Sequence, residues 1–322
     1  MIFPDGDMGI LYECGETNPY ETITFARIPA KTFNPEADKT VLLYPEGQDT
    51  DKGIVENGET VTLGPGESNG ITEAETRNKY GNVSLVGDKA RMEFYFPEKP
   101  NGQMVVVCPG GGYSTVCAIK EGEDVAKWMN KRGVTVCVVV YRLPNGHAKV
   151  PLTDVQNAFR YCRKHAAEWG ISQIGIMGFS AGGHLAASAS VLFTGSITRP
   201  DFSVLIYPVI DLAHHEGTRK ELVGDDKVLK EKYSLQNQIG EDTPRTFIAL
   251  CQDDKVVNPK SSLLYYNSLL DKGIKAEMYI FPTGGHGWGF LNEEISGRKD
   301  GLAGYRNIFG ECLGKFLDEV KK

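Results

Sequence analysis

The fold of this chain is decided by the stretch Ile174-Gly175-Ile176-Met177-Gly178-Phe179-Ser180-Ala181-Gly182-Gly183-His184-Leu185-Ala186-Ala187. It begins as a short apolar strand, turns abruptly, and continues as a helix rich in small residues. The turn carries a G-x-S-x-G pattern centred on Ser180, in which a strained strand-to-helix turn lifts a serine hydroxyl clear of the sheet. Strand and helix nearly touch there, so we expect only glycine or alanine to fit two residues before and two residues after the serine. The stretch therefore predicts a serine nucleophile at the edge of a sheet.

The helix that follows Ser180 adds a second chemical feature to this turn. Its first N–H groups have no hydrogen-bond partner within the helix, and they point into the space beside the serine. The positive end of the helix dipole lies at the same place. Negative charge that develops there is stabilised, and the backbone N–H of Ala181 is one expected donor. A chance match is the alternative, since the chain has 37 glycines. The strand before the motif and the helix after it favour the functional interpretation.

Strands and helices alternate along the chain from Arg91 onward. Alternating residues at 91–96 predict a half-exposed strand, and further strands are expected at 104–108, 134–141, 174–178, 203–208, 247–251 and 276–281. Helices are expected around 125–129, from Pro151 through 162, after Ser180, and at 263–270 and 305–317. Such alternation predicts an α/β fold with a mostly parallel central sheet and helices on both faces. Ligands bind such sheets beyond the carboxyl ends of the strands, which is where the glycine-rich turns fall.

Residues 1–80 differ from the rest of the chain in composition. Glycine, proline, asparagine, threonine and acidic residues interrupt short β-like stretches, two of which, at 40–47 and 60–67, resemble loose copies of one another. We expect a β-rich N-terminal extension, 1–80, that packs on a catalytic domain formed by 81–322. The charged segment 211–244 lies between two strands and is expected to be an insertion, either a lid that shapes the substrate site or a solvated helical excursion.

Composition excludes several classes of partner. The net charge of −7, with no basic cluster, argues against nucleic acid and anionic membranes. No apolar run approaches the ~18 residues of a membrane span. The N-terminus lacks the basic start and apolar core of a signal peptide, so a cytoplasmic protein is expected unless such a peptide has been removed to give a secreted or periplasmic one. The seven cysteines include no C-x-x-C pair, which favours reduced, buried thiols over a zinc or redox site.

A serine nucleophile needs a base, and His286 is the histidine best placed to supply it. In hydrolases built on such a sheet the order is serine, acid, histidine, with the histidine after a late strand. His286 lies in a glycine-rich loop after the strand 276–281, whereas core histidines seldom lie between glycine pairs. His165 is expected on a solvated helix face and His184 on the helix behind the nucleophile. The adjacent His214 and His215 are expected at the surface.

The acid and the oxyanion donors follow two further strands. Cys251-Gln252-Asp253-Asp254-Lys255 contains two competing aspartates, of which one would accept from His286 and the other would brace the turn. Pro109-Gly110-Gly111-Gly112-Tyr113 follows the strand 104–108. Backbone without side chains can approach a substrate closely, so Gly111 and Gly112 are expected to complete an oxyanion hole with Ala181. A phosphate-binding loop is disfavoured, because no G-K-[ST] follows and the G-x-G-x-x-G spacing fails at Thr115.

Together these four motifs, in this order, resemble the α/β-hydrolase superfamily, and more narrowly the bacterial acetyl-xylan-esterase-like carboxylesterases related to the hormone-sensitive-lipase group. The resemblance extends from residue 90 to the end of the chain. It implies a serine carboxylesterase that forms an acyl-enzyme on short acetyl esters of xylan-type carbohydrate, without metal or cofactor. Pro109 stands where the lipase-like group has histidine, which weakens any expectation of lipid substrates. A prolyl-oligopeptidase-type serine peptidase and a feruloyl-type esterase are the alternatives, and the sequence leaves the oligomeric state open.

The resemblance also favours one of the two aspartates as the acid. Esterases of this type commonly have an aspartate three residues before a valine, with a serine a few residues later. Asp254 with Val257 and Ser262 fits this spacing, which favours Asp254 and completes a predicted triad of Ser180, Asp254 and His286. The bulky Tyr113 and Trp288, next to the glycines and the base, predict a small acyl pocket.

Overall fold

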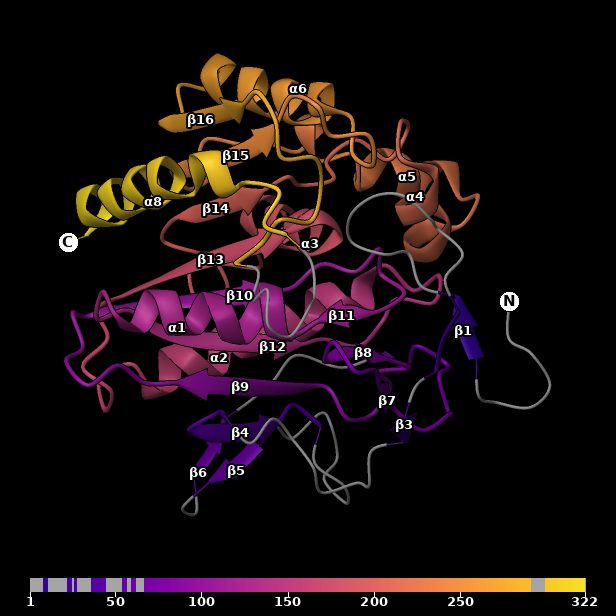
Figure 1. Ribbon diagram of the computed structural model, residues 1–322. Helices are drawn as coiled ribbons and strands as arrows, with labels where there is room; N and C mark the ends of the chain where they lie inside the picture. Colours follow the sequence, from indigo (N-terminus) through magenta and orange to yellow (C-terminus); the bar gives the residue numbers. More distant parts are fainter. Residues whose placement is uncertain are drawn as a thin grey trace.

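A twisted eight-stranded sheet forms the centre of the molecule (Figure 1). The structure is a computed structural model that describes residues 36–44, 67–290 and 299–321, together with the backbone of strands at 8–10, 22–24, 26–27, 54–56 and 59–61. The strand order is β16-β15-β14-β13-β10-β12-β9-β4. The bounds are β4 (Lys39–Leu42), β9 (Arg91–Tyr95), β10 (Gln103–Cys108), β12 (Thr135–Val140), β13 (Gln173–Phe179), β14 (Ser203–Ile206), β15 (Thr246–Cys251) and β16 (Ala276–Phe281).

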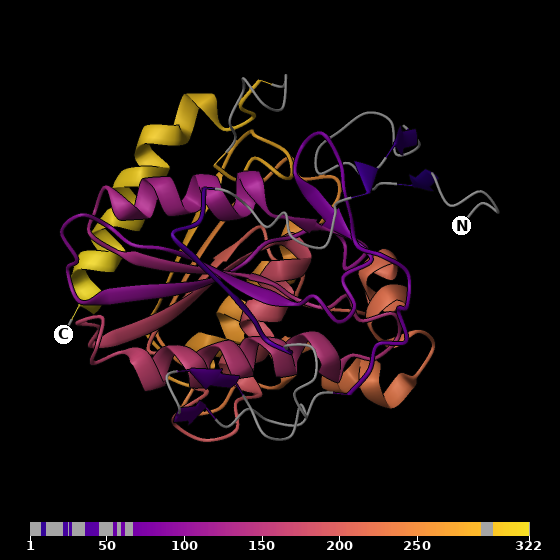
Figure 2. The same ribbon diagram turned by 90° about the horizontal axis from the view of Figure 1, so that it is seen from below.

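The pairing within this sheet confirms the predicted mostly parallel arrangement. Strands from β12 through β16 pair in parallel, whereas β9 and β4 run antiparallel to their neighbours. Helices cover both faces, with α1 and α8 on one side and α2 on the other (Figure 2). Their bounds are α1 (Asp124–Asn130), α2 (Lys149–His165), α3 (Ser180–Val191), α4 (Glu216–Val223), α5 (Lys227–Lys232), α6 (Pro259–Asp271) and α8 (Arg306–Val320).

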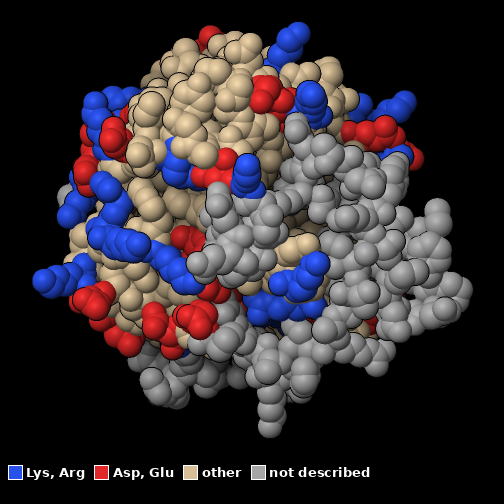
Figure 3. Space-filling view, viewed as in Figure 1, with Lys and Arg blue, Asp and Glu red and all other residues tan. Residues whose placement is uncertain are grey.

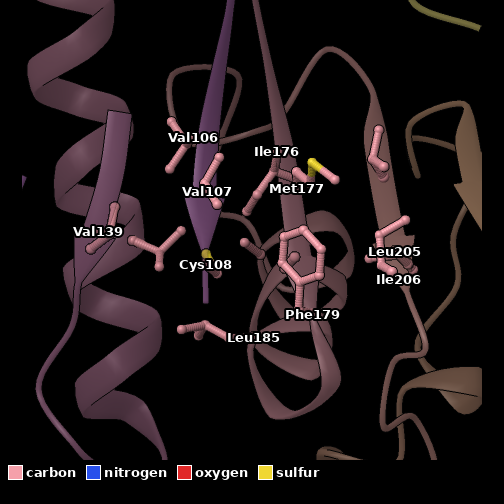
Figure 4. Close-up of a cluster of buried hydrophobic side chains, with 14 of the residues drawn as sticks. Val106, Val107, Cys108, Val139, Ile176, Met177, Phe179, Leu185, Leu205 and Ile206 are labelled. Carbon is pink, nitrogen blue, oxygen red and sulfur yellow. The ribbon is translucent and has the colours of Figure 1, made fainter. Parts of the chain in front are cut away.

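The core lies between the central strands and the helices that cover them. All residues of β10, β12 and β13 are buried, as expected for strands covered on both faces. Figure 4 shows side chains of β10, β13 and β14 interleaved with Val139 of β12 and Leu185 of α3. The close packing fixes the position of each strand end at the edge that carries the glycine-rich turns.

Two expectations about individual elements are corrected. The alternating strand from Arg91 is not half-exposed: all five residues of β9 are buried. Arg91 can be buried because its guanidinium donates to the carboxylates of Glu75 and Glu93, at 2.8 and 3.0 Å. Helix α2 begins at Lys149, two residues before Pro151. A proline is compatible with the first turn of a helix because no N–H in that turn needs an intrahelical partner.

Part of the expected N-terminal extension belongs to the central sheet. The expected strand at 40–47 corresponds to β4, which pairs with β9, while 45–47 lie outside the described residues. The expected strand at 60–67 overlaps β6 (Glu59–Val61), which pairs with β5 (Ile54–Glu56), and 62–66 lie outside the described residues. Residue 80 falls in the turn between β7 (Thr76–Arg77) and β8 (Asn82–Ser84), which pair with each other. These two strands form a second sheet with β3 (Ala26–Arg27) and β11 (Val116–Cys117).

The insertion at 211–244 is packed on the main domain at several positions, whereas no residue of α5 is buried. It contains α4, α5 and the short turn η2 (Leu235–Asn237). Its apolar side chains Leu222, Val223, Tyr233 and Leu235 are buried in the main core. The carbonyl of Tyr233 accepts a hydrogen bond from Nε2 of His184, which ties the insertion to α3. These contacts attach the insertion to the main core and to α3.

The cysteines and the surface agree with a reduced globular protein. All six cysteines in the described part of the chain are free, and five of them are buried; Cys14 lies outside it. None of the described helices has the length and apolar character of a membrane span. On the face that Figure 3 shows, basic and acidic side chains are interspersed, and the surface over α6 and β16 is largely uncharged.

Candidate active site

The turn between β13 and α3 places Ser180 in a strained conformation. Its φ of +52° lies in the left-handed region that side chains rarely adopt. A Cβ at Gly178 would come within 2.2 Å of the Gly182 carbonyl oxygen, and a Cβ at Gly182 within 2.2 Å of the Cys108 carbonyl oxygen. These distances correct the expectation that alanine also fits. Only glycine allows the helix to approach the strands closely enough to form this turn.

Ser180, His286 and Asp254 form one continuous chain of hydrogen bonds. Ser180 Oγ lies 2.8 Å from His286 Nε2, and His286 Nδ1 lies 2.7 Å from Asp254 Oδ2. A carboxylate can only accept, so Nδ1 carries the proton and Nε2 is free to accept from the serine hydroxyl. The side chains of His286 and Asp254 are only 2% and 1% exposed, and Ser180 is 7% exposed. Water therefore competes little for these hydrogen bonds, while the serine stays reachable at the edge of the sheet.

The two aspartates after β15 have different partners. Asp254 Oδ1 accepts from the backbone N–H groups of Val256 and Val257, both at 2.9 Å, which leaves Oδ2 aimed at His286. Asp253 is exposed and accepts from the backbone N–H groups of Gly284 and Gly285, at 3.3 and 2.8 Å. Asp254 thus orients the imidazole, and Asp253 holds the loop that carries it.

The glycine-rich loop after β10 lies against the Ser180 turn. A Cβ at Gly110 would come 3.0 Å from the Cβ of Ser180 and 2.6 Å from the Phe179 carbonyl oxygen. Gly111 and Gly112 have φ values of +129° and +65°, and the Gly111 carbonyl accepts from the N–H groups of Ser114 and Thr115. The N–H of Gly110 donates to Glu121 and is not available to a substrate. Gly111, Gly112 and Ala181 remain the candidate oxyanion donors.

Tyr113 and Trp288 do not have the role in the acyl pocket that was expected of them. Tyr113 is 1% exposed, and its hydroxyl lies 3.0 Å from Nδ1 of the buried His184. Trp288 is 2% exposed and packs against Tyr207 and Phe309, with ring centroids 4.8 and 5.0 Å apart. Both rings belong to the buried core. The positive φ of Tyr113 turns its side chain into the core, which the sequence does not reveal.

Two histidines differ from expectation. His165 is not on a solvated face: its side chain is 15% exposed, and its ring stacks on Trp169 with centroids 5.1 Å apart. His214 is exposed as expected, but the neighbouring His215 is partly buried beside the site. Burial and then the nearby His286 lower the pKa of His215, against the opposing effects of Asp254 and the Val256 backbone. The insertion 211–244 brings His215 close to His286, and no local sequence pattern predicts this contact.

His184, on the inner side of α3, is fully buried between two oxygen atoms. Because the Tyr233 carbonyl can only accept, at 2.8 Å, Nε2 carries the proton and Nδ1 accepts from Tyr113. Burial lowers the pKa of His184 to about 4, so the ring is neutral near pH 7. It fixes Tyr113, the residue directly after the glycine loop.

The sequence alone predicts no role in the site for Glu121 or Tyr207. Glu121 lies in a short charged run that reads as an ordinary helix start, and Tyr207 ends an apolar strand. The structure buries both beside the triad. In the described part of the chain, no group of three or more histidine, cysteine, aspartate or glutamate side chains could hold a metal ion.

Comparisons with known proteins agree with this fold. The chain is 37% identical over 231 residues to an acetylxylan esterase of Xylanibacter ruminicola, covering 68% of this chain and 48% of the relative. It is 35% identical over 211 residues to endo-1,4-beta-xylanase B of Butyrivibrio fibrisolvens, covering 59% and 33%. The acetyl ester-xyloside bifunctional hydrolase from Caldicellulosiruptor lactoaceticus superposes with a TM-score of 0.66 at 27% identity, over 88% of this chain and 97% of that one.

The chain spans about half the length of the first curated relative and a third of the second. A family model described as the alpha/beta hydrolase fold matches residues 105–290, which include Ser180, Asp254 and His286. This chain therefore belongs to the alpha/beta hydrolase family.

Proposed function

We propose that this chain is a serine carboxylesterase that removes acetyl groups from xylan-type carbohydrate fragments. The observation that carries the proposal is the hydrogen-bonded chain of Ser180, His286 and Asp254 at a nucleophile turn. The similarity to an acetylxylan esterase supports the choice of acetyl esters on a carbohydrate.

The arrangement supports an acyl-enzyme mechanism. Ser180 Oγ attacks the ester carbonyl carbon as His286 Nε2 takes its proton, and Asp254 stabilises the imidazolium that forms. The oxyanion accepts from the N–H groups of Ala181, Gly111 and Gly112. His286 then returns the proton to the leaving sugar hydroxyl, which leaves acetyl-Ser180. Water, deprotonated by the same imidazole, attacks the acetyl group and releases acetate and the free serine.

Direct measurement of acetate release from acetylated xylo-oligosaccharides tests the proposal. Wild-type protein should release acetate, and Ser180→Ala should retain less than about one thousandth of the rate while still folded. A p-nitrophenyl ester series from acetyl to octanoyl and a prolyl peptide substrate run beside it. A preference for hexanoyl or longer esters would contradict the carbohydrate assignment, and Ser180-dependent peptide cleavage without acetate release would make the protein a peptidase.

A further inference from the structure

Glu121 is a buried carboxylate whose two oxygens are bound to backbone and side chain at the site. It is 0% exposed. Its Oε2 accepts from the Gly110 N–H at 2.7 Å, and its Oε1 accepts from the Tyr207 hydroxyl at 2.9 Å. Neither donor is a cation. Burying a carboxylate against neutral donors costs free energy that a well-packed apolar side chain would not, so stability alone is a poor reason for its presence.

The backbone around Glu121 has an unusual form. Residues Ile119–Glu123 make a single π-helical turn before α1, closed by a 2.9 Å hydrogen bond from the Glu123 N–H to the Ala118 carbonyl. Single π turns within helices occur frequently at functional sites, because the added residue changes the direction of the side chains around it. This turn faces Glu121 toward the glycine loop and the histidine loop.

Tyr207 continues the connection from Glu121 to the loop of the catalytic histidine. Its hydroxyl accepts from the Gly289 N–H at 2.8 Å, and its ring lies against His286 with centroids 4.8 Å apart. The residue has a φ of +37°, which is strained for tyrosine. The Val209 N–H, two residues further, donates to the Ser180 carbonyl at 3.1 Å. Tyr207 is therefore fixed against both the base and the nucleophile turn.

Steric contacts make the same connection. A Cβ at Gly110 would come within 2.8 Å of Glu121 Oε2, and a Cβ at Gly289 within 3.1 Å of Glu121 Cγ. Lys120, the residue before Glu121, donates from Nζ to the Gly287 carbonyl at 2.9 Å. The oxyanion loop and the histidine loop thus both rest on the π turn.

We propose that Glu121 and Tyr207 are positioning residues that join the oxyanion loop, Gly110–Gly112, to the loop of His286. They thereby fix the positions of the oxyanion donors and of the base relative to each other. This inference rests on the proposed serine hydrolase function. Gly110 precedes the two candidate oxyanion donors in the same loop, so its bond to Glu121 fixes where their N–H groups point. A misplacement of ~1 Å can lower a rate by ~10²-fold, so breaking the connection should lower the rate of the chemical step more than it weakens substrate binding.

The test compares Glu121→Gln, Tyr207→Phe and the double variant with wild-type protein. Tyr207→Phe keeps the ring on His286 and removes only the hydroxyl. The primary readout is the rate at which a p-nitrophenyl phosphonate modifies Ser180, since it requires the base and the oxyanion donors but no natural substrate. The matched control is Tyr44→Phe, which also removes a buried hydroxyl that donates to a buried carboxylate, Asp154 Oδ1, at 2.6 Å.

We expect Tyr207→Phe to lower the phosphonylation rate and kcat on p-nitrophenyl acetate by about tenfold or more, with KM changed less than about threefold. The double variant should be no more than about threefold slower than the slower single variant, because both substitutions break the same connection. Tyr44→Phe should lower Tm and leave the rates unchanged. Any one of three results would overturn the proposal. These are wild-type rates in Tyr207→Phe, a rate in the double variant that falls by the product of the two single effects, or a fall in rate in Tyr44→Phe as large as that in Tyr207→Phe.

The outcomes separate this proposal from the proposed function. If wild-type Ser180 reacts with the phosphonate but no acetyl ester is cleaved, the substrate assignment fails while the rate comparison still decides the role of Glu121 and Tyr207. If wild-type Ser180 does not react at all, both proposals fail.

Discussion

Asp254→Asn is the substitution whose effect the structure determines most closely. It replaces one oxygen by an amino group without changing the size of the side chain. Oδ1 accepts from two backbone N–H groups, those of Val256 and Val257, each at 2.9 Å. Only the amide oxygen can keep these bonds, so the amino group must take the Oδ2 position, 2.7 Å from His286 Nδ1.

An amino group in that position forces the imidazole into the wrong tautomer. It can only donate, so Nδ1 gives up its proton and Nε2 becomes the protonated nitrogen. Nε2 then cannot accept the proton of Ser180. We expect kcat on p-nitrophenyl acetate to fall by ~10⁴, as the corresponding substitution does in a serine triad, which corresponds to about 5.5 kcal/mol of transition-state stabilisation. The two turn bonds remain, so Tm should change little.

Asp253→Asn provides the matched control. Its amide oxygen can keep the 2.8 Å bond from Gly285, and only the 3.3 Å bond from Gly284 is lost. We expect a fall in kcat of a few-fold, about the effect of one weak hydrogen bond. Steady-state kinetics and thermal melts of both variants decide the matter. A loss of less than tenfold in Asp254→Asn, or a larger loss in Asp253→Asn, would refute the assignment of the acid.

Two further predictions concern stability. The pKa of His184 is about 4 in the folded protein, so as pH falls below 6.5 the unfolded chain binds the proton first and the free energy of unfolding decreases. We expect it to drop by about 2 kcal/mol between pH 7 and 5 from this residue, and His184→Gln, compared by urea unfolding at pH 7 and 5, should show a smaller drop. Gly182→Ala places a Cβ 2.2 Å from the Cys108 carbonyl oxygen and should lower the free energy of unfolding by about 3 kcal/mol. Gly240→Ala, which meets nothing within 4 Å, should not; equal thermal melts for the two variants would contradict this reasoning.

The sequence by itself determined the features that depend on local geometry and chain order. The glycines around Ser180 predict its turn because a Cβ at either position would overlap backbone atoms. Continuous apolar runs predict β10, β12 and β13, since a strand covered on both faces has no polar side. The glycine-rich loop of His286 follows the last strand of an alternating pattern, which places it at the same edge of the sheet as the serine.

Only the tertiary structure decided which distant side chains meet at that edge. Asp253 and Asp254 are neighbours in one turn, and the direction of each side chain depends on which backbone N–H groups surround it. The bond between Glu121 and Tyr207 joins residues 86 positions apart. Their contact follows from the order of the strands and the packing of a π turn against a loop. Such long-range contacts leave no periodic signal in the chain, because neither residue's local pattern depends on its partner.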